Sequence, residues 1–241
     1  MNYDLDQSYG VPVAASHAAV RAAFIKRTYA HLLGAVLAFV GLEAFLFSTG
    51  MAEQIIKDVF LANRMAWIAL MVMFVVGGYG AQYLARSHQS VGVQYMGLAL
   101  YVLLEVVFFL PLLYLSMSPM IGGNPNIPIQ AGIVTLAVFG GLTAAVFVSG
   151  KDFSFMGPIL WTGFAVAFGV VIASILFGFS LGLLFSGAMV ALAAGFIIYS
   201  TSNVMHRYGS NEHVAASLEL FAAIAMLYYY ILRIFFLSRN D

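Results

Sequence analysis

Seven apolar runs, each of about the length needed to cross a bilayer, are the feature that most limits what this chain can fold into. They cover approximately residues 29–50, 65–85, 91–115, 130–149, 156–178, 181–204 and 214–237. Only 8% of the 241 residues are charged and 63% are hydrophobic, whereas a soluble domain has about a quarter charged residues. The sequence therefore predicts an all-α integral membrane protein, a bundle of seven transmembrane helices.

The polar start of the chain predicts a short tail before a single membrane domain. Residues 1–28 are mixed in character and contain an amphipathic stretch from His17 to Arg27. We expect them to form a cytoplasmic tail that lies partly on the membrane surface, followed by one domain over residues 29–241. No short apolar stretch with a basic lead and a cleavage site follows Met1, so we expect no signal peptide. The link from Gly178 to Leu181 is so short that it predicts a tight hairpin, or a sixth helix that starts below the surface.

The distribution of basic residues between the loops predicts the orientation. Cytoplasmic loops of membrane proteins carry an excess of Lys and Arg. An N-terminus on the inside places six of these residues inside: Arg21, Lys26, Arg27, Arg86, Lys151 and Arg207. It leaves three outside: Lys57, Arg64 and Arg239. We therefore expect the N-terminus inside and, after seven spans, the C-terminus outside.

Composition and motifs argue against several classes of function. The net charge is zero without a basic patch, which argues against nucleic acid, and the absence of cysteine excludes disulfides and thiolate chemistry. No aspartate falls in a predicted span, which argues against an aspartyl intramembrane protease, and His31 at the edge of the first span is a poor partner for a serine. A metal needs three or four converging ligands, but His88, His206 and His213 fall in predicted loops. We expect no enzyme, no metal and no cofactor.

The last apolar run, Val214 to Leu237, carries two ionisable residues, Glu219 and Arg233. They lie 14 residues apart, which is about 21 Å along a helix and roughly 40° short of whole turns, so they share one face. Because ionisable groups are costly in contact with lipid, this face should pack against other helices or line a water-filled cavity. We expect this helix to have the others packed around it.

Two further carboxylates, Glu43 and Glu105, fall inside the predicted spans. Their depth resembles that of Arg233, so Arg233 could pair with Glu43, Glu105 or both, whereas Glu219 belongs to the inner half. One interpretation is a cation or proton path lined by Glu43, Glu105 and Glu219, with Arg233 as a latch. The other is a buried ion pair that holds the helices together, with Glu219 reaching the interface.

Three stretches of the chain resemble a known family. They read FIKRTYAHLLGAVLA, GKDFSFMGPILWTGFAVAFGVV and IIYSTSNVMHRYGSNEHVAASLELFAAIAMLYYYILRIF. Together they resemble the Bax inhibitor-1 (TMBIM) family, and specifically its bacterial YccA-like branch, from about Phe24 to Arg239. The most specific segments are Lys151 to Gly157 and Ser200 to Asn203.

The resemblance implies a seven-helix protein of the bacterial inner membrane with its last helix central. It also implies two activities, a pH-sensitive leak of calcium or other cations and binding to the membrane protease FtsH, whose degradation of membrane proteins is restrained. Members with the pH sensor carry two facing aspartates, whose positions are Ser200 and Ala223 here. Arg233 matches the family's arginine, and Glu219 lies one turn before Ala223 on the same face.

Two functions remain open on this basis. The missing aspartates favour a regulatory or interaction protein in the lipid bilayer, acting on FtsH or a related membrane complex. The alternative is a pH-sensitive leak for calcium, other cations or protons, which needs a continuous polar path. The two differ in whether the carboxylates line one water-accessible cavity.

Overall fold

Seven helices are long and apolar enough to cross a membrane within residues 12–63, 65–87, 90–119 and 123–239, which the computed structural model describes. They are α1 (Ala18–Ser48), α3 (Met65–Ala85), α4 (Val91–Met117), α5 (Ile127–Ser149), α6 (Gly157–Phe177), α7 (Leu183–His206) and α8 (His213–Leu237). The prediction of an all-α bundle of seven transmembrane helices is confirmed.

The first helix begins earlier than expected. It starts at Ala18 and not near residue 29, so the amphipathic stretch from His17 to Arg27 continues directly into the span. The reason is local, because no glycine or proline interrupts the chain between Ala18 and Gly34. Residues 18–28 thus belong to α1, residues 1–11 lie outside the described part, and a cytoplasmic tail over residues 1–28 stays a prediction.

Four short helical elements connect or extend the long ones. They are η1 (Val13–Ala15), α2 (Met51–Ile55), the π-helical turn η2 (Ile56–Leu61) and η4 (Ser154–Met156), which leads into α6. The sequence did not predict α2 and η2. They fold back on the bundle because Phe60 packs against Trp67, whose indole N–H donates to the Phe60 carbonyl at 3.2 Å.

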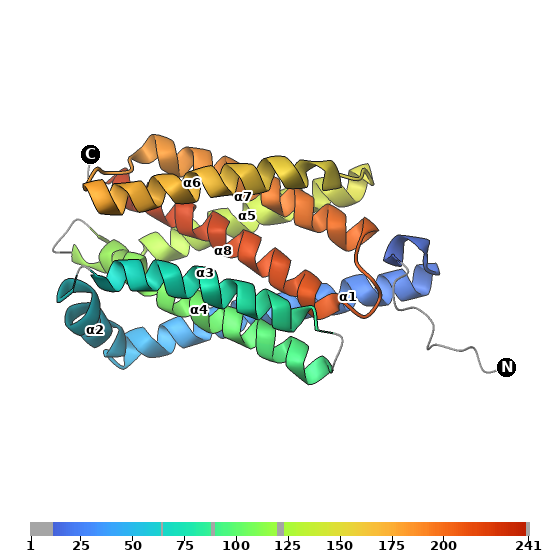
Figure 1. Ribbon diagram of the computed structural model, residues 1–241, viewed down its shortest axis with the longest axis horizontal. Helices are drawn as coiled ribbons and strands as arrows, with labels where there is room; N and C mark the ends of the chain where they lie inside the picture. Colours follow the sequence, from blue (N-terminus) through green and yellow to red (C-terminus); the bar gives the residue numbers. More distant parts are fainter. Residues whose placement is uncertain (1–11, 64, 88–89, 120–122, 240–241) are drawn as a thin grey trace.

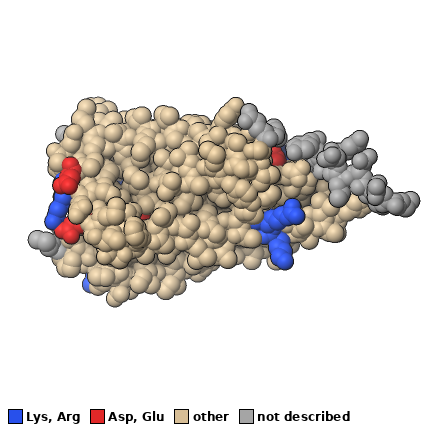
Figure 2. All heavy atoms as spheres, turned by 90° about the horizontal axis from the view of Figure 1, so that it is seen from below, with Lys and Arg blue, Asp and Glu red and all other residues tan. Residues whose placement is uncertain are grey.

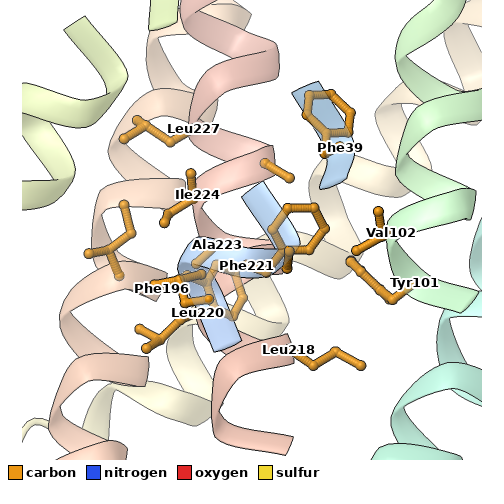
Figure 3. Packing of buried hydrophobic residues seen from close by; sticks show 14 of the residues in the cluster. Phe39, Tyr101, Val102, Phe196, Leu218, Leu220, Phe221, Ala223, Ile224 and Leu227 are labelled. Carbon is orange, nitrogen blue, oxygen red and sulfur yellow. The ribbon is translucent and has the colours of Figure 1, made fainter. Parts of the chain in front are cut away.

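Helix α8 runs through the centre of the bundle (Figure 1). It contacts α1, α3, α4, α5 and α7, which confirms the expected central last helix. Phe39 of α1, Tyr101 of α4 and Phe196 of α7 converge on it (Figure 3). Small buried residues such as Ala216 and Ala223 line α8 and let its neighbours approach closely.

The exposed Lys and Arg side chains visible in Figure 2 lie toward the two ends of the bundle. On the face shown in Figure 2 a broad band without Lys or Arg separates them, as expected for the part that contacts lipid. Helices α1 and α8 both begin at one end, here called the N-terminal end, and α8 finishes at the other, the C-terminal end (Figure 1). Which end faces the cytoplasm stays a prediction.

The link between α6 and α7 is a tight hairpin, one of the two expected forms. Helix α6 stops at Phe177, Gly178 takes the left-handed conformation with φ of 76°, and α7 begins at Leu183. The 24 residues of α7 extend for about 36 Å, which exceeds the roughly 30 Å of a hydrocarbon core. Helix α7 is therefore long enough to span the membrane.

Helices α3 and α4 approach each other most closely at Gly97. A Cβ atom at this position would lie 2.5 Å from both the Ala81 carbonyl oxygen and the Ala85 amide nitrogen. Both alanines are fully buried. The two backbones touch here, which only glycine permits.

We predict that Gly97→Ala destabilises the bundle by about 1–3 kcal/mol, because the added methyl group pushes the α3 and α4 backbones apart. Thermal unfolding in detergent measures this change. Gly140→Ala in α5 is the matched control, since nothing lies within 4 Å of its Cβ position. Equal melting temperatures for the two variants would contradict the prediction.

Candidate functional site

The most polar group of contacts inside the bundle surrounds Glu219 of α8. Its Oε1 accepts hydrogen bonds from Ser200 Oγ at 3.0 Å and from Asn203 Nδ2 at 3.2 Å, both on α7. Its Oε2 accepts a hydrogen bond from the Tyr208 hydroxyl. The side chain of Glu219 is 21% exposed, so this carboxylate is partly shielded but not sealed from water.

Arg86 completes this cluster from a third helix. It follows the end of α3, and its guanidinium lies 3.8 Å from Glu219 Oε2. The arginine side chain is 60% exposed. A solvent-exposed ion pair at this distance contributes little to the free energy of unfolding. It nevertheless ties α3 to α8 at the N-terminal end through a contact that is easily exchanged for water.

The local sequence explains why these groups meet. Ser200 and Asn203 lie three residues apart, so they share the face of α7 that looks at α8. The short connection between the two helices turns Tyr208 back toward Glu219. Burial raises the pKa of Tyr208 well above its usual value, and the neighbouring Glu219 carboxylate raises it further. The hydroxyl therefore keeps its proton and stays a donor.

The segment before α1 braces the loop that carries Tyr208. The Val13 amide donates to the Tyr208 carbonyl at 2.8 Å, and Pro12 and Gly209 form an isolated antiparallel bridge. Val13 is fully buried. Element η1 thus lies over the loop, and Tyr208 is held on its backbone side by η1 and on its side-chain side by Glu219.

The two most specific segments of the sequence, residues 151–157 and 200–203, meet at the same end. The Phe153 amide donates to Ser202 Oγ at 2.8 Å, and Arg207 donates to Ser154 Oγ at 2.5 Å. The Ser154 amide donates to Asp152 and holds the pKa of this carboxyl below its usual value. Asp152 therefore stays ionised beside Arg207, and the segments together anchor the start of α6 to the end of α7.

Arg233 does not pair with Glu43 or Glu105, so the expected ion pair is wrong. Its guanidinium donates to the Leu181 carbonyl at 2.5 Å and lies 5.9 Å from the centre of the Phe185 ring. Leu181 belongs to the link before α7, where a carbonyl has no helical partner and is open to a side-chain donor. In the described part of the chain, neither glutamate takes part in an ion pair.

The two remaining carboxylates are buried and lie apart from Glu219. Glu105 is 3% exposed, and its carboxyl is hydrogen-bonded to the hydroxyl of Tyr101, one turn earlier on α4. Glu43 is 6% exposed, and neither of its carboxyl oxygens has a hydrogen-bond partner among the described residues.

Four aromatic side chains, Phe39, Tyr101, Phe109 and Phe221, form a layer between Glu219 and Glu43 along the bundle axis. The Phe221 ring lies 6.3 Å from Phe39 and 6.2 Å from Tyr101, and Phe39 lies 5.0 Å from Phe109. Figure 3 shows Phe39 and Tyr101 beside α8. All four residues are buried, so their rings occupy the interior of the bundle between the two carboxylates.

No group of three His, Cys, Asp or Glu residues is placed to hold a metal ion in the described ranges. His31 and His213 have ring centres 5.0 Å apart, and His31 Nε2 is bonded to the Tyr95 hydroxyl at 2.7 Å. His206 Nδ1 contacts the Ser202 carbonyl at 3.0 Å, and His88 lies outside the described residues. His31 and His206 are thus bonded within the bundle, whereas His213 Nδ1 has no hydrogen-bond partner among the described residues.

A shallow recess of about 380 Å³ lies at the C-terminal end, away from Glu219. It is lined by Trp67, Ser174, Ile175, Gly178, Phe179 and Ser180. Because it contains no ionisable side chain, it offers no acid–base or ion chemistry, and the polar cluster at Glu219 is the better candidate site.

Comparison with known proteins identifies the family. The profile described as "Inhibitor of apoptosis-promoting Bax1" matches residues 21–241. The chain belongs to the Bax inhibitor family. Among its relatives is mouse protein lifeguard 4, 27% identical over 230 residues, which cover 95% of this chain and 90% of the mouse protein.

Other Bax inhibitor relatives match over shorter stretches. A BI1-like protein of Arabidopsis thaliana is 40% identical over 116 residues, which are 45% of this chain and 44% of that protein. An uncharacterized protein of Pseudomonas aeruginosa is 33% identical over 123 residues, which are 49% of this chain and 55% of that protein. For these two relatives the chain spans about half of their length.

The two positions at which the family resemblance implies aspartates differ in their surroundings. Ser200 donates its hydroxyl to Glu219, whereas Ala223 is 5% exposed in the apolar core (Figure 3). In this Bax inhibitor protein, Glu219 lies one turn of α8 before position 223 and is hydrogen-bonded to position 200. Sequence spacing placed Glu219 on this face of α8.

Sequence reasoning missed Arg86 and Tyr208. Each lies just beyond the end of a helix, at positions that belong to predicted loops. Arg86 directly follows an apolar run, and from the sequence it indicated only the orientation of the protein in the membrane. Nothing local marks Tyr208 as a partner of Glu219, since the contact depends on how the loop between α7 and α8 folds back.

We predict that Tyr208→Phe destabilises the protein by about 1–3 kcal/mol, because Glu219 Oε2 loses its hydroxyl donor in a partly buried site. Thermal unfolding in detergent measures the effect. Tyr79→Phe is the control, because Tyr79 is 72% exposed, and its melting temperature should match the wild type. An unchanged melting temperature for Tyr208→Phe would show that the hydroxyl contributes nothing.

Proposed function

We propose that this Bax inhibitor family protein is a pH-sensitive cation leak whose closed state is held by Glu219. The observation that supports this is the convergence of α3, α7, α8 and the Tyr208 loop on one titratable carboxylate at the N-terminal end. The missing aspartates alone favoured an interaction protein. The hydrogen bond between Ser200 and Glu219 makes us favour the leak over the interaction protein. A carboxylate is still present close to the place where the family's sensor is expected.

Protonation of Glu219 is the step that opens this arrangement. It removes the negative charge, so Arg86 loses its counter-ion and turns to water, and the bonds from Ser200 and Asn203 lose their charge assistance. Helices α7 and α8 are then held together less tightly at the N-terminal end. The aromatic layer must move as well before an ion passes.

The donor atoms around Glu219 suit a hard cation or a proton. Asn203 Oδ1 is buried without a hydrogen-bond partner among the described residues, close to the carboxylate that its Nδ2 contacts. Carboxylate and amide oxygens are the ligands that calcium prefers in proteins. We therefore propose calcium or protons as the permeating species.

We predict that liposomes containing the protein take up calcium faster on the acid side of neutrality than on the alkaline side. Glu219→Gln should remove this pH dependence, because the amide cannot ionise and leaves the closed state without its ion pair. Loss of a pair worth about 1 kcal/mol raises the alkaline flux about fivefold. A calcium-sensitive dye enclosed in the liposomes reports the rate.

Glu53→Gln is the matched control for this experiment. Glu53 lies at the opposite end, pairs with Lys57 at 2.5 Å, and is 53% exposed. Its loss should leave the flux and its pH dependence unchanged. A folded wild-type preparation without flux on either side of neutrality, or an unaltered pH profile in Glu219→Gln, would overturn the leak.

A second candidate is a regulator that binds the membrane protease FtsH or a related complex, as in the YccA-like branch of the bacterial inner membrane. The observation that favours it is the position of α6 at the edge of the bundle, where it packs mainly on α7. Its outer face exposes Ile159, Val166 and Phe177, which suit a partner's transmembrane helix.

We predict, for this second function, that a membrane protease crosslinks to residues on the outer face of α6 and not to the lipid-facing side of α5. Photo-crosslinkers placed at position 166 of α6 and at position 136 of α5 allow the comparison in native membranes, since Val166 and Leu136 are both exposed. Equal yields from both positions would indicate random collision and contradict a specific contact.

A further inference from the structure

A buried carboxyl at the far side of the aromatic layer has no role in the Glu219 cluster. Glu43 lies on α1, five residues before its end at Ser48, and therefore near the C-terminal end. Glu219 lies near the start of α8 at the other end. The two carboxyls occupy opposite halves of the bundle, with the aromatic layer between them.

The surroundings of Glu43 are aromatic and leave it unbonded. Phe39, one turn earlier, lies 5.0 Å from Phe109 and 6.5 Å from Tyr228 between ring centres. Tyr228 also stacks on Phe109 at 5.4 Å. The Tyr228 hydroxyl is occupied, because it donates to the Pro128 carbonyl at 3.3 Å. Glu43 is 6% exposed, so water does not supply the missing bonds.

The charged and titratable groups of the elements packed on α1 are engaged elsewhere. Helix α4 carries Glu105, which bonds Tyr101, and α2 carries Glu53, which pairs with Lys57. Helix α8 carries Arg233, which donates to Leu181, and Glu219, which is bound in its own cluster. Tyr228 of α8 lies close enough to interact with Glu43, and its neutral hydroxyl supplies no positive charge.

We propose that Glu43 is a second proton-binding site of this protein, which holds its proton in the half of the membrane opposite to Glu219. An ionised carboxylate here would lack water, hydrogen-bond donors and a counter-charge, and such a group neutralises instead. The protonated form needs none of these to be tolerated. The proposal stands independently of the leak proposed for Glu219.

This site differs from the Glu219 cluster in its bonding. Glu219 has three hydrogen-bond donors and an arginine nearby. Glu43 has none of these among the described residues. The bundle therefore holds one carboxyl that is bonded near the N-terminal end and one that is buried without a bond in the opposite half.

Infrared spectroscopy of the protein in bilayers tests this directly, because a protonated carboxyl has a C=O stretch distinct from that of a carboxylate. Labelling glutamate with ¹³C shifts this band and separates it from lipid ester carbonyls. We expect a shifted band at neutral pH in the wild type and its loss in Glu43→Gln, whose side chain matches the protonated acid in size. Circular dichroism and the melting temperature establish that the variant is folded.

Glu105→Gln and Glu219→Gln are the matched controls. Each variant should leave the Glu43 band in place. The infrared result for Glu43 therefore does not depend on whether the flux experiment supports the leak. The proposal is overturned if Glu43→Gln retains every protonated-carboxyl band of the wild type at neutral pH. It is also overturned if the band that Glu43→Gln removes is absent at neutral pH and grows in only near pH 4, where an exposed glutamate titrates.

Discussion

The cost of placing a carboxyl in hydrocarbon decides how this bundle is built. Its three intramembrane glutamates meet that cost in three ways. Glu219 keeps bonds to Ser200, Asn203 and Tyr208 and lies near the water at one end. Glu105 is hydrogen-bonded to Tyr101, and Glu43 is buried without a hydrogen-bond partner among the described residues. Helix α8 is central because its polar residue and its small apolar residues both require neighbours on every side.

Much of the fold could be predicted from the sequence, because a membrane span leaves a strong signal in hydropathy. The seven helices lie close to their apolar runs, and α8 is central as expected. The early start of α1 at Ala18 has a local signal, the absence of glycine and proline before Gly34. Residues 51–61 could not be predicted, since their helical turns depend on packing against the bundle, as for Phe60 on Trp67. Their sequence alone reads as a loop.

The candidate site could be predicted only in part. Glu219 and Ser200 stand out as polar groups in apolar helices, and helical spacing places Glu219 correctly. Arg86 and Tyr208 join them through contacts across the fold, which no local pattern encodes. The pairing of Arg233 with a glutamate failed because depth along a helix does not specify direction around it. The carbonyl of Leu181 was the nearer acceptor.

The bracing of the Tyr208 loop by Val13 gives the start of the chain a mechanical role. The Val13 amide bonds the backbone of the residue whose hydroxyl bonds Glu219. A pull on the chain ahead of α1, by a bound protein or by a lipid surface, would thus be transmitted to the polar centre through two hydrogen bonds, without first moving a membrane-spanning helix. Residues 12 and 13 are in this way connected to the Glu219 carboxylate through Tyr208.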